Sequence, residues 1–286
     1  RSSDLVLYYG VQALRAKQNF PITGTKLHPV FIKNLAQVKK AAAITNNNAG
    51  LLPKDKADAI VRACDEVIAG KWAEEFIVDA IQGGAGTSAN MNMNEVIANR
   101  AGELLGCPKG SYKMVHPNDH VNMAQSTNDV IPTAGKLTVL DLLAPLEKAL
   151  GRLERELAKK AEEFDDVITM GRTQLQDAVP IRLGQVFHGY ASMVARDRKR
   201  IEKAHKEMYT VNLGGTAVGT AINVSDSYFY KVVPNLERLT GYPLRQAEDL
   251  FDATENLDGF VAVSGVVKTC AVDLSKMCND LRLMSS

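Results

Sequence analysis

The chain has 286 residues, of which 45% are hydrophobic and 23% are charged, so one or two domains with sizeable cores are possible. Its 34 basic and 33 acidic side chains nearly cancel, which argues against binding to nucleic acid or to an anionic membrane surface. No apolar run approaches the roughly 20 residues of a membrane span, and the four cysteines form no CxxC pair, so we expect a soluble, cytoplasmic protein.

The first part of the chain predicts short helices separated by loops. Helical periodicity is expected near residues 28–50, 54–70 and 92–106. Because loops interrupt these helices, residues 1–126 are predicted to form an N-terminal helical domain. Alternating apolar runs of useful length are absent, so no convincing strand is predicted.

The rest of the chain predicts three long helices. The first spans about 133–164 and carries leucines spaced alternately three and four residues apart, at Leu143, Leu146, Leu150, Leu153 and Leu157. The second, 181–209, is expected to begin after Pro180, where a missing N–H does no harm. The third, 248–284, is apolar on more than one side and is expected to be buried among others. We therefore predict an all-α fold in which residues 127–286 form a central helical bundle.

Segments dense in hydroxyl and amide side chains interrupt this helical pattern at residues 83–95, 116–129 and 171–180. Each is expected to end where a long helix begins, at Asn94, Thr133 and Pro180. N-capping and turns require one or two such side chains per helix, and these segments contain many more. Helix N-termini attract anions through free N–H groups and the helix dipole. The pattern therefore indicates a small dicarboxylate held between several helix starts.

Other polar features carry weaker signals. The Gly-rich segment 212–220 predicts a break between helices, and its glycines allow close approach to the other loops. Residues 82–88 lack the GxGxxG spacing and the GK[ST] ending of phosphate loops. His116 and His120 lie inside the second polar segment, where hydrogen bonding within the loop is the expected role. No histidine pair has metal-ligand spacing with a third ligand nearby, so no metal site is predicted.

Short motifs along nearly the whole chain occur in the order of one known superfamily. They are Gly84-Ala-Gly-Thr-Ser88 with Asn94-Glu95, His116-Pro-Asn-Asp-His120 with Ser126-Thr-Asn-Asp129, and Gly171-Arg-Thr-Gln-Leu-Gln176. The combination resembles the aspartase/fumarase superfamily. This resemblance implies an N-terminal helical domain, a central long-helix bundle and a small C-terminal domain. It also implies a homotetramer in which the central bundles associate and each active site is shared among subunits.

Within the superfamily, three details resemble the aspartate ammonia-lyases more than the class II fumarases. Thr127 stands where fumarases typically have a second serine, Gln174 stands where they usually have histidine, and the ending 279–286 is aspartase-like. The resemblance implies reversible elimination of ammonia from L-aspartate to give fumarate through an aci-carboxylate intermediate. Two alternatives stay open: hydration of fumarate by a class II fumarase, and a non-catalytic helical scaffold.

The resemblance also implies the substrate contacts made by the polar segments. Thr87, Ser126 and Thr127 are expected to hold the β-carboxylate of the substrate. Asn128 is expected to contact the α-carboxylate or the amine.

The remaining expected groups come from other parts of the assembly. Thr173 and Gln174 are expected to reach the pocket from a neighbouring subunit, and Arg15 is a weaker candidate for orienting the substrate. The resemblance implies that the catalytic base is a serine in a flexible loop beyond Ser286, followed by further bundle helices and the C-terminal domain. The base is therefore not expected in this chain, which is expected to be inactive alone. No organic cofactor is implied, and activation by magnesium stays open.

Overall fold

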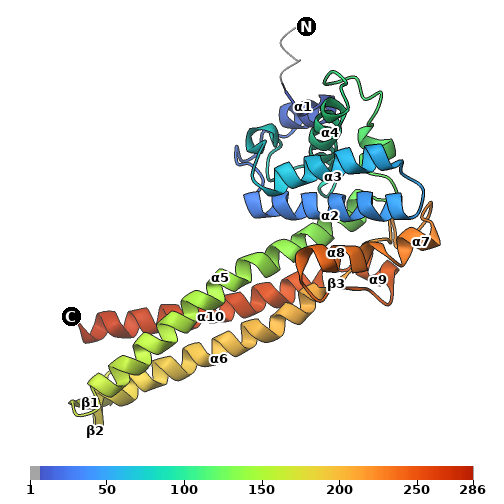
Figure 1. Cartoon of the computed structure of the whole chain (residues 1–286). Helices are drawn as coiled ribbons and strands as arrows, with labels where there is room; N and C mark the ends of the chain where they lie inside the picture. The colour runs from blue at the N-terminus through green and yellow to red at the C-terminus, as the bar shows by residue number, and fades with distance from the viewer. Residues whose placement is uncertain (1–6, 286) are drawn as a thin grey trace. The chain divides into compact units, whose positions relative to one another are not determined.

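A computed structural model describes residues 7–285, and these form a mainly helical fold (Figure 1). The α-helices are α1 (Val11–Asn19), α2 (Pro29–Asn48), α3 (Lys54–Ile68), α4 (Thr87–Leu104), α5 (Thr127–Glu163), α6 (Leu183–Tyr209), α7 (Asp226–Phe229), α8 (Val232–Thr240), α9 (Leu250–Glu255) and α10 (Asp258–Met284). The shorter elements are the helical turns η1 (Ala73–Glu75) and η2 (Pro117–Val121) and the strands β1 (Ile168–Thr173), β2 (Gln176–Arg182), β3 (Thr210–Val211) and β4 (Arg245–Gln246). The expected all-α class is confirmed. Within the described range, no helix combines the length and apolar character needed to cross a membrane.

The chain folds into two compact units. Unit 1 contains the described residues up to Val139 together with Tyr209–Leu257, and unit 2 contains Leu140–Met208 and the residues from Asp258 onward. The segment 209–257 belongs to unit 1 because it packs on α2, where Asn235 Nδ2 donates to Thr45 Oγ1 at 2.7 Å. The sequence-based division into domains 1–126 and 127–286 stays a prediction, and the compact units follow different boundaries.

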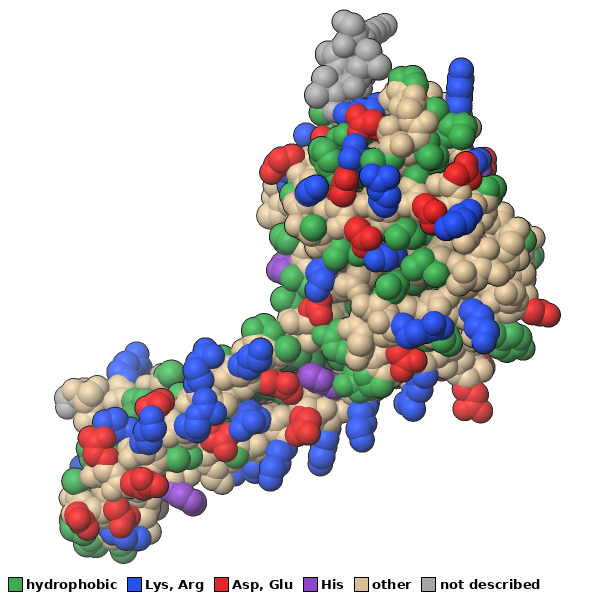
Figure 2. Space-filling view, in the orientation of Figure 1, with side chains coloured by type: hydrophobic (Ala, Val, Ile, Leu, Met, Phe, Trp, Pro, Cys, Tyr) green, Lys and Arg blue, Asp and Glu red, His purple; other side chains and the backbone are tan. Residues whose placement is uncertain are grey.

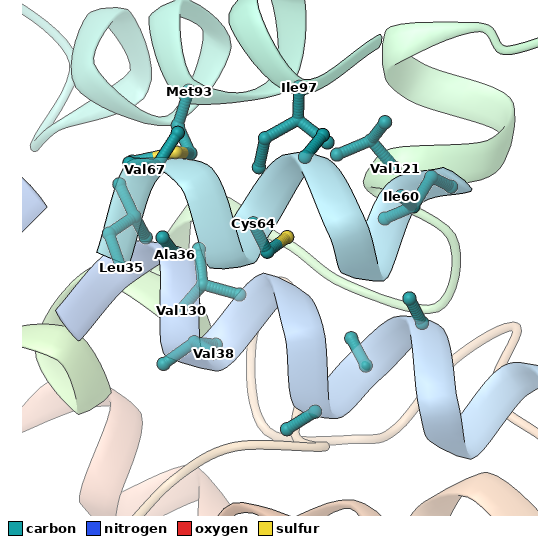
Figure 3. Packing of buried hydrophobic residues seen from close by; sticks show 14 of the residues in the cluster. Leu35, Ala36, Val38, Ile60, Cys64, Val67, Met93, Ile97, Val121 and Val130 are labelled. Atoms are coloured by element: carbon teal, nitrogen blue, oxygen red, sulfur yellow. The ribbon is translucent and has the colours of Figure 1, made fainter. Parts of the chain in front are cut away.

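The core of unit 1 is built from the apolar faces of α2, α3 and α4 (Figure 3). On α3, Ile60, Cys64 and Val67 are buried at spacings of four and three residues, which places them on one face. The facing α2 is rich in buried alanines, which lets the two helices approach closely, and α4 adds Met93 and Ile97. Each fully buried side chain of this size contributes about 1.5–3 kcal/mol. This core holds α4 and the start of α5 against α2.

The long helices of unit 2 carry buried residues that repeat every seven positions. These are Leu143, Leu150 and Leu157 on α5, Val194, Ile201 and Met208 on α6, and Val263, Cys270 and Met277 on α10. A seven-residue repeat keeps one seam of each helix facing its partners, so the predicted long-helix bundle is confirmed. Leu146 and Leu153, the alternate leucines of the predicted stripe, are only half-buried. Val261 of α10 is 71% exposed within this chain, so the expected burial of α10 among other helices stays a prediction.

Charged side chains of both signs are interspersed over the long helices of unit 2, on the face that Figure 2 shows. Several form pairs along one helix, such as Lys159 with Glu156 at 2.7 Å and Lys160 with Glu163 at 2.6 Å. Exposed pairs of this kind contribute a few tenths of a kcal/mol, about 0.2–0.5 each. They keep the surface solvated, while the heptad seam stabilises the bundle.

The starts of two helices differ from the sequence-based prediction. α4 begins at Thr87 and α5 at Thr127, whereas starts near Asn94 and Thr133 were expected. The low helix propensity of Thr, Ser and Asn underlies this error. In the fold, tertiary contacts outweigh propensity, because Asn90, like the other asparagines of the first turns of α4, is buried.

Two further segments differ from the expected long helices. The third polar segment forms an antiparallel hairpin of β1 and β2, with Pro180 opposite Met170, and α6 starts only at Leu183. The expected absence of strands is therefore wrong here. The segment 248–284 is two helices, because Asn256 adopts an extended backbone and its side-chain amide donates to the Asp252 carbonyl at 3.3 Å.

Candidate active site

The N-termini of α4 and α5 meet in unit 1. Thr87 and Thr127 are the first residues of these two helices. Gly86 precedes α4 with a φ of 96°, and a Cβ at this position would lie 2.9 Å from Cγ2 of Ile131 on α5. Asn90, in the first turn of α4, donates from Nδ2 to Thr127 Oγ1 at 3.1 Å. Several of the first N–H groups are bonded within the chain, among them Ala89 N–H to Gln82 Oε1 at 2.6 Å. What each helix start offers an anion is therefore mainly the positive end of its dipole.

Two hydroxyls at the start of α5 act as acceptors inside the chain. Ser126 Oγ accepts from the Asn128 N–H at 3.2 Å, and Thr127 Oγ1 accepts from Asn90. A hydroxyl that accepts still carries one hydrogen to donate. Neither hydroxyl donates to another group in the part of the chain that the structure describes. Ser126 and Thr127 therefore present two hydroxyl hydrogens to an incoming acceptor.

The Thr87 hydroxyl is engaged differently. Its Oγ1 donates to the Gly84 carbonyl at 2.6 Å, within the Gly-rich loop before α4. Thr87 is exposed. A ligand that receives this hydrogen has to replace the bond to Gly84.

Asn128 is fixed by the Gly-rich segment 212–220. Pro132 has no N–H, so the carbonyl of Asn128, four residues earlier in α5, lacks its helical donor. Asn212 Nδ2 supplies that donor at 3.0 Å, while Asn128 Nδ2 donates to the Ala217 carbonyl at 2.7 Å. Asn128 is exposed, and its carboxamide oxygen is left for other donors.

A buried carboxylate joins the same Gly-rich segment to α5. Asp129 is fully buried and accepts from the Ser126 N–H at 2.9 Å, the Gly214 N–H at 3.0 Å and the Thr216 N–H at 3.1 Å. Burial raises the pKa of Asp129 to about 6, and the N–H donors and the charge of Lys39 act in the opposite direction. Asp129 therefore holds the loop around Ser126 and the segment 212–216 as one rigid piece.

A buried lysine lies beneath this piece. Lys39, on α2, is fully buried and donates to Asn122 Oδ1 at 2.8 Å and to Gln125 Oε1 at 3.0 Å. Burial lowers the pKa of Lys39 to about 7, and the negative charge of Asp129 partly offsets this effect. Lys39 is not among the residues predicted from the sequence. The sequence gives no clear signal for its burial, because Gln37 and Lys40 stand beside it and the segment looks partly solvated.

Arg15 lies on α1, where it is exposed. The start of α1 is held by Glu95 of α4, whose Oε2 accepts from the Gly10 N–H at 2.9 Å and the Ala13 N–H at 3.1 Å. Glu95 Oε1 accepts from the Gln12 N–H at 2.9 Å. Helix α4 therefore carries Thr87 at its start and, through Glu95, also fixes the start of α1, on which Arg15 lies.

Thr173 and Gln174 belong to unit 2, and the cluster in unit 1 is built without them. Thr173 is the last residue of β1, and the two-residue loop Gln174-Leu175 joins it to β2. Both loop residues have positive φ, 52° and 63°, as the two-residue turns that match strand twist require. Such angles are strained for side chains other than glycine. The hairpin tip is fully exposed in this chain.

The histidines of the second polar segment bond within their own loop, as predicted. His120 Nδ1 accepts from the His116 N–H at 2.8 Å, and His116 Nδ1 accepts from the Asp119 N–H at 3.3 Å. Across residues 7–285, no group of three or more His, Cys, Asp or Glu side chains is arranged to hold a metal ion.

Known proteins match both the sequence and the fold. An aspartate ammonia-lyase from Bacillus sp. is 54% identical over 279 residues, which cover 98% of this chain and 60% of the relative. The aspartate ammonia-lyase of Escherichia coli K12 is 47% identical over 282 residues, covering 98% and 59%. A structure described as fumarate lyase:delta crystallin from Brucella melitensis bound to cobalt has a TM-score of 0.97 and 48% identity, over 99% of this chain and 62% of that one. A class II fumarase from Schistosoma mansoni has a TM-score of 0.95 and 36% identity, over 99% and 63%.

These matches agree on the family. The chain spans about 60% of the length of the curated relatives that it matches. A family model described as lyase matches residues 6–286. Because this match covers nearly all of the sequence, the resemblance to the aspartase/fumarase superfamily is confirmed, and the chain belongs to this lyase family.

Proposed function

We propose that the protein containing this chain eliminates ammonia from L-aspartate to give fumarate, reversibly. The observation that carries the proposal is the junction of two helix starts, where Ser126 and Thr127 present hydroxyl hydrogens that no described group accepts. The similarity to aspartate ammonia-lyases over 98% of the chain supports the choice of substrate.

The chemistry explains why the site is rich in uncharged donors. A base removes a proton from the carbon next to the β-carboxylate, and the electron pair moves into that carboxylate to form an aci-carboxylate dianion. Collapse of the dianion forms the carbon–carbon double bond and expels the amine as ammonia. Each preorganised donor to the dianion is worth roughly 3–4 kcal/mol in the transition state.

The proposed roles follow the donors. Ser126 and Thr127 donate to the β-carboxylate, and Thr87 joins them when its hydroxyl leaves the Gly84 carbonyl. Asn128 contacts the α-carboxylate or the amine. The rigid piece held by Asp129 keeps these groups in place before substrate arrives, which lowers the cost of binding the dianion.

A neighbouring subunit completes the proposed site. We assign Thr173 and Gln174 of one subunit to the pocket of another within a homotetramer. The exposed hairpin supports this assignment, because Ile168, Leu175 and Val179 are 69%, 77% and 60% exposed on it, and a group of exposed apolar side chains marks an interaction surface. Arg15 is proposed to orient the substrate.

The remaining proposals concern the base, the cofactor and the location. None of the groups described above is assigned as the base, which the resemblance expects in a serine loop beyond Ser286. The reaction needs no organic cofactor, and magnesium enters the proposal only as an activator. A cytoplasmic location is proposed because all four cysteines are free thiols.

Substitution of Thr127 in the full-length protein tests the function. Thr127→Val keeps the volume and removes the hydroxyl, and we expect fumarate production from L-aspartate to fall on the order of 100-fold. Thr127→Ser keeps the hydroxyl and serves as the matched control, with activity close to that of the parent. Turnover of the valine variant within twofold of the parent would rule out the electrostatic role.

Hydration of fumarate is the second candidate, favoured by the similarity of the fold to a class II fumarase. Loss of fumarate absorbance distinguishes the two reactions when it is followed with and without added ammonia. The proposal expects loss only with ammonia. Equal loss in water alone assigns the protein to fumarate hydration.

A further inference from the structure

A chain of side-chain amides runs from Lys39 to the hydroxyl of Thr127. It begins at Lys39 Nζ, which donates to the side-chain oxygens of Asn122 and Gln125. Gln125 turns its Oε1 toward Lys39 because its Nε2 donates to two backbone carbonyls, those of Val121 at 2.9 Å and Met123 at 3.0 Å. The orientation of the Gln125 amide is therefore set by groups that cannot reverse their roles.

The same reasoning orients Asn122. Its Oδ1 accepts from Lys39 at 2.8 Å, and its Nδ2 donates to the Gln125 carbonyl at 3.3 Å. A flipped amide would turn its oxygen toward the Gln125 carbonyl oxygen, and two acceptors cannot form a hydrogen bond. Asn122 Oδ1 is consequently a fixed acceptor.

Asn122 in turn orients Asn90. The Asn90 atom that faces Asn122 Oδ1, at 3.3 Å, has to be the nitrogen Nδ2. The same Nδ2 donates its second hydrogen to Thr127 Oγ1 at 3.1 Å. Because Thr127 receives a hydrogen from Asn90, its own hydroxyl hydrogen points elsewhere.

This orientation carries a cost. Asn90 is 2% exposed, and its Oδ1 is a buried acceptor with no hydrogen-bond partner in the described part of the chain. Leaving such an atom unpaired is unfavourable, and unsatisfied polar atoms in native proteins call for a reason. The free carbonyl of Asn90 is the consequence of turning both amide hydrogens toward Asn122 and Thr127.

We propose that Asn90 is a positioning residue: its amide, oriented from Lys39 through Asn122, keeps the Thr127 hydroxyl hydrogen available to the substrate carboxylate. This inference rests on the proposed function, in which Thr127 donates to the β-carboxylate. A hydroxyl that rotates freely has to be fixed in one orientation when it donates to the substrate, and this lowers its contribution to binding. A hydroxyl whose lone pair is already occupied is a preorganised donor.

Asn90→Asp tests the inference with almost no change in shape. The introduced carboxylate only accepts, so it captures the Thr127 hydroxyl hydrogen and withdraws it from the substrate. We expect kcat for L-aspartate to fall on the order of 100-fold with little change in KM, since the lost interaction strengthens in the transition state.

Asn99→Asp is the matched control. Asn99 is also on α4, is 4% exposed and donates to the Tyr8 carbonyl at 2.8 Å, away from the helix start. The same chemical change there is expected to leave kcat within about threefold of the parent. A comparable loss of kcat in both variants would mean that the effect is general damage to α4, and it would overturn the inference.

A double-mutant cycle with Thr127→Val supplies the readout that a purely structural role would not move. If Asn90 acts through the Thr127 hydroxyl, Asn90→Asp costs less than about threefold in the Thr127→Val background. Losses that multiply would overturn the inference. If Asn90→Asp lacks the helical circular dichroism of the parent, Asn90→Ala replaces it in the same cycle. We then expect kcat to fall about tenfold in the parent and to stay unchanged in the Thr127→Val background. A parent without activity on aspartate refutes the proposed function, whereas an active parent with multiplicative losses refutes only the role of Asn90.

Discussion

Asp129→Asn should loosen the rigid piece that presents the hydroxyls. The carboxylate accepts from the Gly214 and Thr216 N–H groups through Oδ2 and from the Ser126 N–H through Oδ1. An amide has one acceptor oxygen, so at best the two bonds at Oδ2 survive and the Ser126 N–H faces an NH2 group. Each hydrogen bond to a buried charged group is worth about 1.5–3 kcal/mol. Removing the buried charge recovers part of this, and we expect a net loss of about 2 kcal/mol in the free energy of unfolding.

Urea denaturation of the full-length protein at pH 7.5, followed by circular dichroism, measures this loss. The matched control is Asp58→Asn on α3, where the carboxylate is 60% exposed and pairs with Lys54 at 3.0 Å. Exposed pairs contribute little, so the control is expected within about 0.5 kcal/mol of the parent. If Asp129→Asn also stays within that range, the backbone donors do not depend on the carboxylate, and the account of the rigid piece is wrong.

Three further substitutions test other parts of unit 1. Gly219→Ala should lower the free energy of unfolding by more than about 2 kcal/mol, because the φ of Gly219 is 91° and a Cβ there would lie 2.5 Å from backbone atoms. The control Gly50→Ala, with a φ of 74° and open space around the Cβ, should cost about 1 kcal/mol in the same denaturation assay. Burial lowers the pKa of Lys39 from 10.5 to about 7. Between these two pH values the unfolded chain holds a proton that the folded chain has lost, so the free energy of unfolding rises with pH by up to about 1.4 kcal/mol per pH unit. Lys39→Met should abolish that slope, and equal slopes in parent and variant from pH 7.5 to 9.5 would contradict it. Glu95→Gln should weaken the hydrogen bonds that hold the start of α1. If Arg15 orients the substrate, KM should rise about tenfold, the equivalent of ~1.4 kcal/mol, and an unchanged KM would contradict this role.

The long helices could be predicted, and a candidate site could be proposed, because each leaves a dense local pattern in the sequence. The heptad leucines at Leu143, Leu150 and Leu157 are buried as expected, since apolar spacing reports directly on which face is covered. The polar segments around Thr87 and Ser126 contain far more hydroxyls and amides than helix capping needs. Both signals are carried by neighbouring residues and do not require knowledge of the fold.

The missing parts of the prediction depend on contacts between distant residues. Lys39 reads as an ordinary surface lysine until α2 is placed beneath Asn122, 83 residues later in the chain. The sequence does not predict the strands around Gly171, because the hairpin is largely exposed and the apolar–polar alternation of β1 lasts only from Ile168 to Gly171. Asn212 could not be assigned a role because it donates to the Asn128 carbonyl, 84 residues earlier, which Pro132 leaves without its helical donor.

The hydroxyls proposed to bind the β-carboxylate should not contribute equally. The Thr127 hydrogen is already available, whereas the Thr87 hydrogen is bonded to the Gly84 carbonyl at 2.6 Å and has to exchange that bond for one to the substrate. An exchanged hydrogen bond yields less net free energy than a new one, because the broken bond is subtracted. Thr87→Val should therefore lower kcat/KM about tenfold, against about 100-fold for Thr127→Val, when both are measured with L-aspartate. An equal or larger loss of kcat/KM for Thr87→Val would show that breaking the hydrogen bond between Thr87 and the Gly84 carbonyl costs no free energy. The hydroxyls at the two helix starts would then be equivalent donors.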